Sequence, residues 1–157
     1  MPLYACIAHQ INQIAPATNN KSRMNSHVVL SGLCLKSIPN NVIRNRECIE
    51  KLSLDRNLLT ENSFNMPQFV NLKELSVRNN KIKNIAIFIA NLQRKCPNLE
   101  VLMFENNLGC PDRFTEKEKT IISKCLKKLR ILNGFEVHRQ KRHSNCSTDS
   151  KISSASE

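Results

Sequence analysis

One spacing of apolar residues recurs along this chain and constrains its fold more than any other feature. The stretch NLKELSVRNNKIKNI, residues 71–85, shows it with a single asparagine inside the frame, Asn80. Its apolar positions are Leu72, Leu75, Val77, Ile82 and Ile85. Written as L-x-x-L-x-L-x-x-N-x-L, the spacing is neither the alternation of a strand nor the 3.6-residue period of a helix. Such a repeat decides the architecture and has to be recognised before single elements are assigned.

Copies of this frame start at residues 25, 49, 72, 99 and 129. The second and fourth copies carry asparagine at the same position, Asn57 and Asn107, although Gly109 stands where the fourth copy should have an aliphatic residue. The first copy, in HVVLSGLCLKSIP, has Leu33 in place of the asparagine, and the last, in LKKLRILNGFEV, is truncated at Val137. Three near-complete copies are the signature of a leucine-rich repeat.

The frame predicts an α/β leucine-rich-repeat solenoid, a short horseshoe. We expect a parallel concave β-sheet of about four to five strands, helices and 3-10 turns on the convex side, and a C-terminal helical cap. Each unit buries its apolar face only against its neighbours. The structural asparagines are Asn57, Asn80 and Asn107, which we expect to satisfy backbone groups where the chain leaves the strand. A buried polar group without a partner costs about 1–3 kcal/mol.

The same frames give the domain organisation. Residues 1–24 carry no frame and are predicted to be a flexible arm, while residues 138–157 form a basic, Ser-rich tail that we expect to be disordered. Residues 25–137 form the repeat domain. Its predicted units are repeats 25–48, 49–71, 72–98 and 99–128, and cap 129–137.

Two helices are predicted on the convex side. An apolar stripe at helical spacing follows Asn80 and stops before Pro97; it consists of Ile85, Phe88, Ile89 and Leu92. Thr115 and Glu118 have the spacing of a capping box at the start of the second helix. Its buried face is predicted to consist of Ile121, Ile122, Cys125 and Leu126.

Cysteine usage points to reduced thiols. The seven cysteines include no C-x-x-C pair, and their odd number excludes complete pairing within one chain. We expect Cys34, Cys48 and Cys96 to behave as small core hydrophobes. The expected compartment is the cytoplasm, with the nucleus as the alternative. No run approaches the roughly 18 apolar residues of a membrane span, so no transmembrane segment is expected.

The sequence contains no arrangement of residues that is typical of a catalytic or metal-binding site. None of the four histidines stands beside a plausible nucleophile in the frame, and the sequence has no glycine-rich phosphate loop, no paired carboxylates and no clustered Cys and His ligands. We therefore expect neither an enzyme nor a cofactor nor a metal site.

The C-terminal half carries a more specific resemblance. KCPNLEVLMFENNLGCPDRF, followed by LKKLRILNGFEV, resembles intracellular leucine-rich-repeat proteins with a terminal cap. That group includes the regulatory subunit of type-1 protein phosphatase and the spliceosomal A-prime subunit. The run from Asn98 to Pro111 is most similar to the leucine-rich melanocyte differentiation-associated protein family. The resemblance implies a non-catalytic adaptor or scaffold connected with melanocyte differentiation and melanosome traffic. Its alternatives are a ribonucleoprotein-associated subunit or a phosphatase regulatory subunit.

The register of the frame predicts a partner-binding surface. Side chains that point outward from the strands, and those just after them, form a stripe of mixed charge on the concave face. The predicted contact residues are Lys51, Asp55, Arg56, Glu74, Arg78, Val101, Met103 and Glu105. Arg56, Arg78 and Met103 are the expected anchors, because Arg and Met are enriched in interface cores. We expect a monomer that docks a protein partner here.

A net charge of +11 gives a rival hypothesis. Basic residues gather near the C-terminal end, at Lys124, Lys127, Lys128, Arg130, Arg139, Lys141 and Arg142. Such a cluster suits nucleic acid, an acidic lipid surface or nuclear import. With one Tyr, six Phe and no Trp, the chain is poor in side chains on which bases stack. We therefore expect nucleic-acid binding to be absent or indirect.

Overall fold

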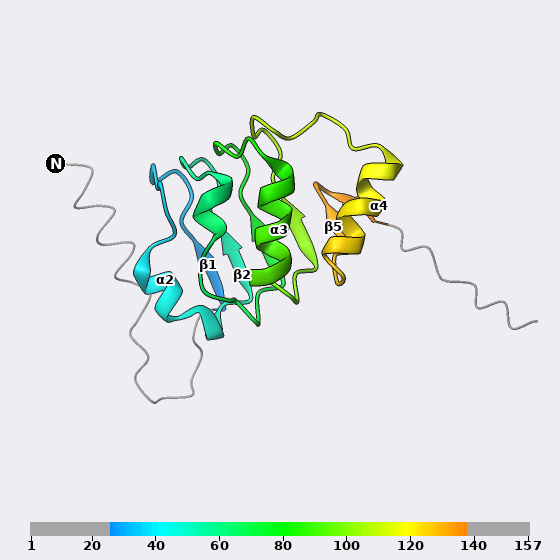
Figure 1. The fold of residues 1–157 in the computed structure, drawn as a ribbon. Helices are drawn as coiled ribbons and strands as arrows, with labels where there is room; N and C mark the ends of the chain where they lie inside the picture. The colour runs from blue at the N-terminus through cyan, green and yellow to red at the C-terminus, as the bar shows by residue number, and fades with distance from the viewer. Residues whose placement is uncertain (1–25, 138–157) are drawn as a thin grey trace, which may run out of the picture.

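The computed structural model of the chain describes residues 26–137. The arm (1–24) and the tail (138–157) expected from the sequence lie outside the described residues. Within them the chain is mixed α/β, with a mostly parallel six-stranded sheet and a few helices (Figure 1).

The sheet follows the order of the chain. Its strands are β1 (His27–Val29), β2 (Lys51–Ser53), β3 (Glu74–Ser76), β4 (Val101–Met103), β5 (Ile131–Leu132) and β6 (Phe135–Glu136). Strands β1 to β5 pair in parallel, each with the next, and β6 pairs antiparallel with β5.

The register of the sheet is that of the sequence frame. Each of the five parallel strands begins two residues after the first position of its frame. Leu75 pairs with Leu52 on one side and with Leu102 on the other, and Leu102 pairs with Leu132. Because side chains alternate across a strand, these leucines all point to the buried face of the sheet.

The sixth strand was not expected from the repeat. Asn133 and Gly134 both have positive φ, 49° and 81°, which is the conformation of a two-residue hairpin turn. The turn sends the chain back along β5, so the sheet ends in an antiparallel strand. Asn-Gly is a dipeptide typical of such turns, but the repeat frame alone did not predict the hairpin.

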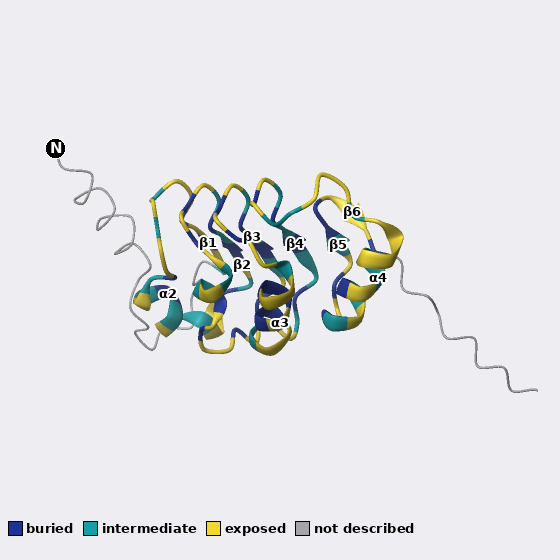
Figure 2. Cartoon of the chain, turned by 45° about the horizontal axis from the view of Figure 1, so that its top comes forward, coloured by how far each residue is buried: buried dark blue, intermediate teal, exposed yellow. Residues whose placement is uncertain are grey.

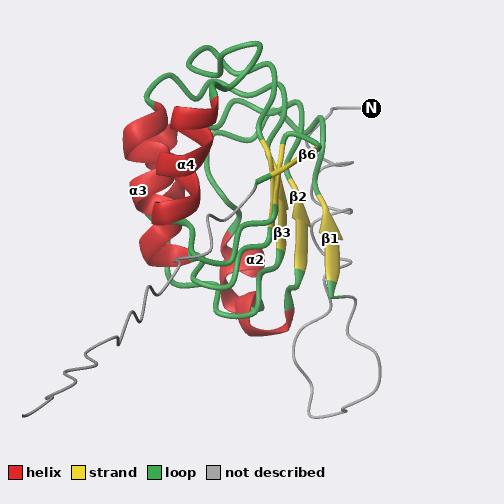
Figure 3. Ribbon diagram, turned by 90° about the vertical axis from the view of Figure 1, so that its right-hand side faces the viewer, coloured by secondary structure: helices red, strands yellow, loops and turns green. Residues whose placement is uncertain are grey.

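Helical segments lie on the buried side of the sheet, the side to which its leucines point, as Figure 3 shows for α3 and α4. They are α2 (Asn40–Arg44), the 3-10 helices η1 (Arg46–Cys48) and η2 (Glu61–Phe64), α3 (Ile85–Lys95) and α4 (Glu116–Cys125). The Asn84 side chain caps α3 by accepting from the amide of Ile87. Within residues 26–137, no helix combines the length and the apolar character that a membrane crossing requires.

The capping box predicted for α4 is confirmed. The Thr115 hydroxyl accepts from the amide of Glu118, and the Glu118 carboxylate accepts from the amide of Thr115. The predicted buried face of α4 was wrong at Ile121, which is 54% exposed, whereas Ile122 and Leu126 are buried. Helix α4 therefore packs against the core through a narrower apolar stripe than the sequence predicted.

The core is not purely aliphatic. Between the sheet and the helices, four aromatic rings follow one another, Phe64, Phe88, Phe104 and Phe114, with centroids 4.9, 5.5 and 5.6 Å apart. Such edge and tilted pairs are favourable ring geometries. The line runs from η2 through α3 to the loop after β4 and so links three successive units. Figure 2 shows buried positions along the strands and on α3.

The expectation for the cysteines holds at one position of three. Cys96 is buried, and its burial raises the pKa of the thiol to about 12. Cys34 and Cys48 are exposed, so the prediction that they behave as core hydrophobes was wrong. Cys34 follows the turn of the first unit at a positive φ of 54°, and Cys48 ends η1; both positions face solvent rather than the core.

Candidate functional site

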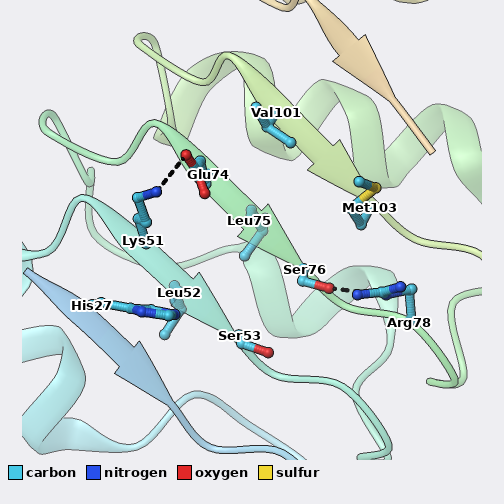
Figure 4. Close-up of a pocket in the computed structure, with 10 residues that line it drawn as sticks. All are labelled: His27, Lys51, Leu52, Ser53, Glu74, Leu75, Ser76, Arg78, Val101 and Met103. Atoms are coloured by element: carbon cyan, nitrogen blue, oxygen red, sulfur yellow. Dashed lines mark hydrogen bonds and ion pairs between the residues drawn. The ribbon is translucent and has the colours of Figure 1, made fainter. Parts of the chain in front are cut away.

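The candidate site is the side of the sheet that α3 and α4 leave uncovered, here called the open face. It consists of the outward-pointing strand residues and the turn residues that follow them. A hollow of about 270 Å³ lies at its centre (Figure 4). The residues that line it come from four strands and the turn after β3: His27, Lys51, Leu52, Ser53, Glu74, Leu75, Ser76, Arg78, Val101 and Met103.

The first outward position of each strand forms one row across the open face. Strand pairing aligns its members in the order His27, Lys51, Glu74, Val101 and Ile131. The Lys51 ammonium lies 2.8 Å from the Glu74 carboxylate, and the two side chains stand side by side in Figure 4. The two charges of this row therefore compensate each other.

A second row of charges lies at the turns after the strands. The Asp55 carboxylate accepts from the Ser76 hydroxyl and from the backbone amide of Arg78, both at 2.7 Å. The Arg78 guanidinium lies 3.5 Å from Asp55 and 3.9 Å from Glu105. Asp55, with its side chain only 19% exposed, thus ties its own turn to the next one. Arg78 is held between two carboxylates.

Between these rows lies a third, uncharged row, the trough, which consists of Val29, Ser53, Ser76 and Met103. Pairing places Val29 beside Ser53, Ser53 beside Ser76, and Ser76 beside Met103. The Ser53 hydroxyl lies 3.1 Å from that of Ser31, and the Ser76 hydroxyl donates to Asp55. The small serines form the floor of the trough, while Val29 and Met103 stand at its ends.

The turns that carry the second row are fixed from inside by asparagines. The Asn80 side-chain oxygen accepts from the amide of Leu59 in the preceding unit, while its nitrogen donates to the carbonyls of Leu54 and Val77, each bond at 3.0 Å. Asn57 and Asn107 make equivalent bonds to their own and the preceding unit. Their contacts are therefore to backbone groups, and all three side chains are buried.

The residue before each of these asparagines adopts a left-handed conformation. Arg56, Asn79 and Asn106 have φ near 56°, and Gly32 has the corresponding position in the first unit. Asparagine and glycine adopt this region more readily than arginine. Arg56 is therefore a conformational exception, and its exposed side chain projects from the turn; among residues 26–137 it forms no ion pair.

The predicted contact residues all lie on one face of the sheet, but most of the charged ones are already engaged in ion pairs. Val101 and Met103 are half-buried beside the hollow. Lys51, Glu74, Arg78, Asp55 and Glu105 are engaged in ion pairs with one another. Ile131 extends the apolar end of the face and was missed; applying the frame at residue 129 would have placed it beside Val101.

Sequence reasoning also missed a second hollow, of about 320 Å³, at the C-terminal end. It lies between the loop after β4 and the β5–β6 hairpin. Phe135, which is 63% exposed, borders it, and the Lys119 ammonium lies 5.7 Å from the centre of that ring. Cys110 lines the same hollow, and burial raises the pKa of its thiol against the opposing effect of a hydrogen bond from Asn133. The sequence signal for this region was the Asn133-Gly134 turn.

Within the described range, no group of three or more His, Cys, Asp or Glu side chains is arranged to hold a metal ion. Every buried side-chain nitrogen or oxygen of residues 26–137 has a hydrogen-bond partner.

Comparison with known proteins gives a likeness of fold. No family model matches the chain, and no curated protein matches it. Among solved structures, a chain in the structure of Chaetomium Mex67:Mtr2 subunits is similar, with a TM-score of 0.55 and 20% sequence identity. The match covers 87% of this chain and 91% of that chain. At this identity the likeness concerns the fold alone.

Proposed function

We propose that residues 26–137 form a leucine-rich-repeat solenoid that docks a protein partner on its open face, as a non-catalytic adaptor or scaffold. The single observation that carries the proposal is the hollow that the outward strand side chains form on the uncovered side of the sheet. The shared register of β1 to β5 with the sequence frame and the hydrogen bonds of the three asparagines support the repeat assignment.

The resemblance to leucine-rich melanocyte differentiation-associated proteins suggests the setting of this docking. On that basis we place the protein in the cytoplasm, as a monomer that takes part in melanocyte differentiation. The nucleus is the alternative compartment, with a ribonucleoprotein or phosphatase complex as the alternative assembly. Expression of the tagged chain in pigment cells, followed by fractionation and identification of co-purifying proteins, distinguishes these assemblies.

The docking proposal is tested by charge insertion at Met103. Met103→Arg places a long cation at the edge of the hollow, and we expect it to reduce partner capture from pigment-cell lysate by at least about tenfold, which corresponds to about 1.4 kcal/mol. Ile87→Arg is the matched control, because Ile87 is 44% exposed on α3, on the other side of the sheet. Equal capture by wild type and Met103→Arg, with both proteins folded by circular dichroism, would contradict the proposal.

The basic cluster supports a second candidate function, association with RNA. Lys124, Lys128 and Arg130 are all exposed at the C-terminal end of the described region, whereas Arg139, Lys141 and Arg142 lie outside the described residues. Phosphate contacts make binding strongly dependent on salt. A titration of labelled RNA at increasing salt tests this function: steep weakening supports it, while an absence of binding even at low salt removes it.

A further inference from the structure

We propose that the trough of the open face holds an amphipathic α-helix of a protein partner, lying across strands β1 to β4 with its apolar stripe toward Ser53 and Ser76. The inference rests on the proposed docking function and names the kind of partner segment that the face fits. It follows from the charge pattern, the hydrogen bonds and the dimensions of the trough.

Charge argues for an apolar contact. The cations Lys51, Arg56 and Arg78 on this face are equal in number to the anions Asp55, Glu74 and Glu105. All of them except Arg56 are paired with one another. The Lys51–Glu74 pair lies along one side of the trough, while Arg78 reaches from the other side and donates to the Ser76 hydroxyl at 3.3 Å. A charged partner segment would have to compete with these existing pairs. An uncharged apolar stripe leaves them intact, with its own polar edges beside them.

Hydrogen bonding argues for a helix rather than an extended segment. The Ser53 hydroxyl on the floor already contacts that of Ser31, and the Ser76 hydroxyl donates to Asp55 and accepts from the Arg78 guanidinium. The strands below use their backbone groups to pair with each other. An extended segment laid across this floor would bury amides and carbonyls without partners, at about 1–3 kcal/mol for each group. A helix satisfies its backbone internally and presents only side chains.

The dimensions agree with three helical turns. Val29 on β1 and Met103 on β4 stand at the two ends of the trough, three strand spacings apart. Neighbouring strands lie about 4.8 Å apart, which gives a span of about 14 Å. At about 1.5 Å per residue, roughly ten helical residues cover this distance. The partner stripe should therefore have apolar residues at i, i+3 or i+4, i+7 and i+10 or i+11, with small or medium side chains over the serines.

The test is a selection of binders from a random peptide library displayed on phage, with the full chain as the target. Recovered peptides are measured against wild type, Ser53→Arg and the matched control Ser37→Arg, since Ser37 is exposed and lies outside the open face. We expect the peptides to have the apolar spacing given above and to gain helical circular dichroism on binding. Their affinity should fall at least about tenfold with Ser53→Arg, about 1.4 kcal/mol, and stay unchanged with Ser37→Arg.

Other outcomes separate this inference from the docking function. Peptides that lose binding with Ser53→Arg but are extended, Pro-rich or strongly charged would overturn the helix and leave docking on the open face in place. Peptides that bind equally to all three proteins, or a selection that yields no binder, would overturn both. Salt provides a further criterion, because binding through a neutral trough should change by less than about threefold over a salt range in which multiple charge contacts weaken by about 10³-fold or more.

Discussion

The interior of the sheet and its C-terminal end differ in how each unit is connected to its neighbours. In the interior, Asn57, Asn80 and Asn107 each join two units through bonds from a buried side chain. At the C-terminal end, Asn133 also reaches the preceding unit, but with fewer bonds to the backbone: its oxygen accepts from the amide of Phe104, its nitrogen donates to the Cys110 sulfur, and its turn starts the hairpin. Strands β2 to β4 each pair with a parallel strand on both sides, whereas β5 pairs in parallel with β4 on one side and antiparallel with β6 on the other.

The largest effect is expected from truncation of a leucine on the buried face of the sheet. Leu75 is 1% exposed between β2 and β4, so Leu75→Ala should cost about 2–5 kcal/mol through the cavity that it leaves. Leu132→Ala, at the end of the parallel stack, should cost less, because its surroundings can collapse more easily. Urea unfolding followed by circular dichroism measures both. Equal losses of unfolding free energy in the two variants would contradict the expected difference between the interior of the sheet and its C-terminal end.

Alanine substitutions at Asn80 and Asn133 compare the interior with the C-terminal end in a second way. Asn80→Ala leaves the buried amide of Leu59 without its partner and removes one of the two side-chain bonds to each of the Leu54 and Val77 carbonyls, which still accept from Asn57 and Asn107. Asn133→Ala removes the partner of the Phe104 amide and a weak bond to the Cys110 sulfur. At about 0.5–1.5 kcal/mol for each lost hydrogen bond, the two additional carbonyl bonds should make the loss at Asn80 larger than that at Asn133 by about 1 kcal/mol or more. Thermal and urea unfolding of the two variants, each beside wild type, give the comparison. A larger loss at Asn133 would contradict the role assigned to the interior asparagines.

Substitutions at Gly109 and Gly134 measure separately how steric overlap and backbone strain reduce the free energy of unfolding. A Cβ at Gly109 would overlap the carbonyl oxygen of Lys83 in the preceding unit, so Gly109→Ala should cost about 1–3 kcal/mol. At Gly134 nothing lies within 4 Å, and only the φ of 81° opposes a side chain. Gly134→Asn, which tolerates that conformation, should therefore be nearly neutral. A neutral Gly109→Ala would show that the fourth unit can move away from the third.

The smallest effect concerns acid stability. The Lys83 amide donates to the Glu61 carboxylate and holds its pKa below the ordinary 4.5; at Glu118 the Thr115 amide has the same effect on the pKa. A folded-state pKa below the unfolded value means that this stabilisation is present above about pH 4.5 and is lost as pH falls through the folded pKa. Stability curves of wild type and Glu61→Gln from pH 7 to pH 3 should converge at the acid end. Parallel curves would contradict this contribution.

The interior of the fold could be predicted from the sequence because each frame position has one environment. Leu52, Leu75 and Leu102 recur with the same neighbours, so their spacing alone predicted that they lie side by side. The hairpin after Asn133, the exposure of Ile121 and the aromatic line from Phe64 to Phe114 depend on contacts between units that the frame does not encode.

The candidate site was predictable in position but not in chemistry. Strand alternation placed the side chains of Lys51, Glu74 and Met103 on one face. Register by itself does not show that Arg78 is held between Asp55 and Glu105, or that the serine hydroxyls are already engaged. Those contacts move the expected anchors from the arginines to the uncharged trough.

The stacking of the units carries every claim about the open face, and methyl-resolved NMR of the leucine-labelled protein tests it most directly. Paired strands lie about 4.8 Å apart. We therefore predict cross-strand NOEs from Leu52 to Leu75, from Leu75 to Leu102 and from Leu102 to Leu132, and none from Leu52 to Leu102. An NOE between Leu52 and Leu102, or the absence of one between Leu75 and Leu102, would contradict the stack and the face built on it.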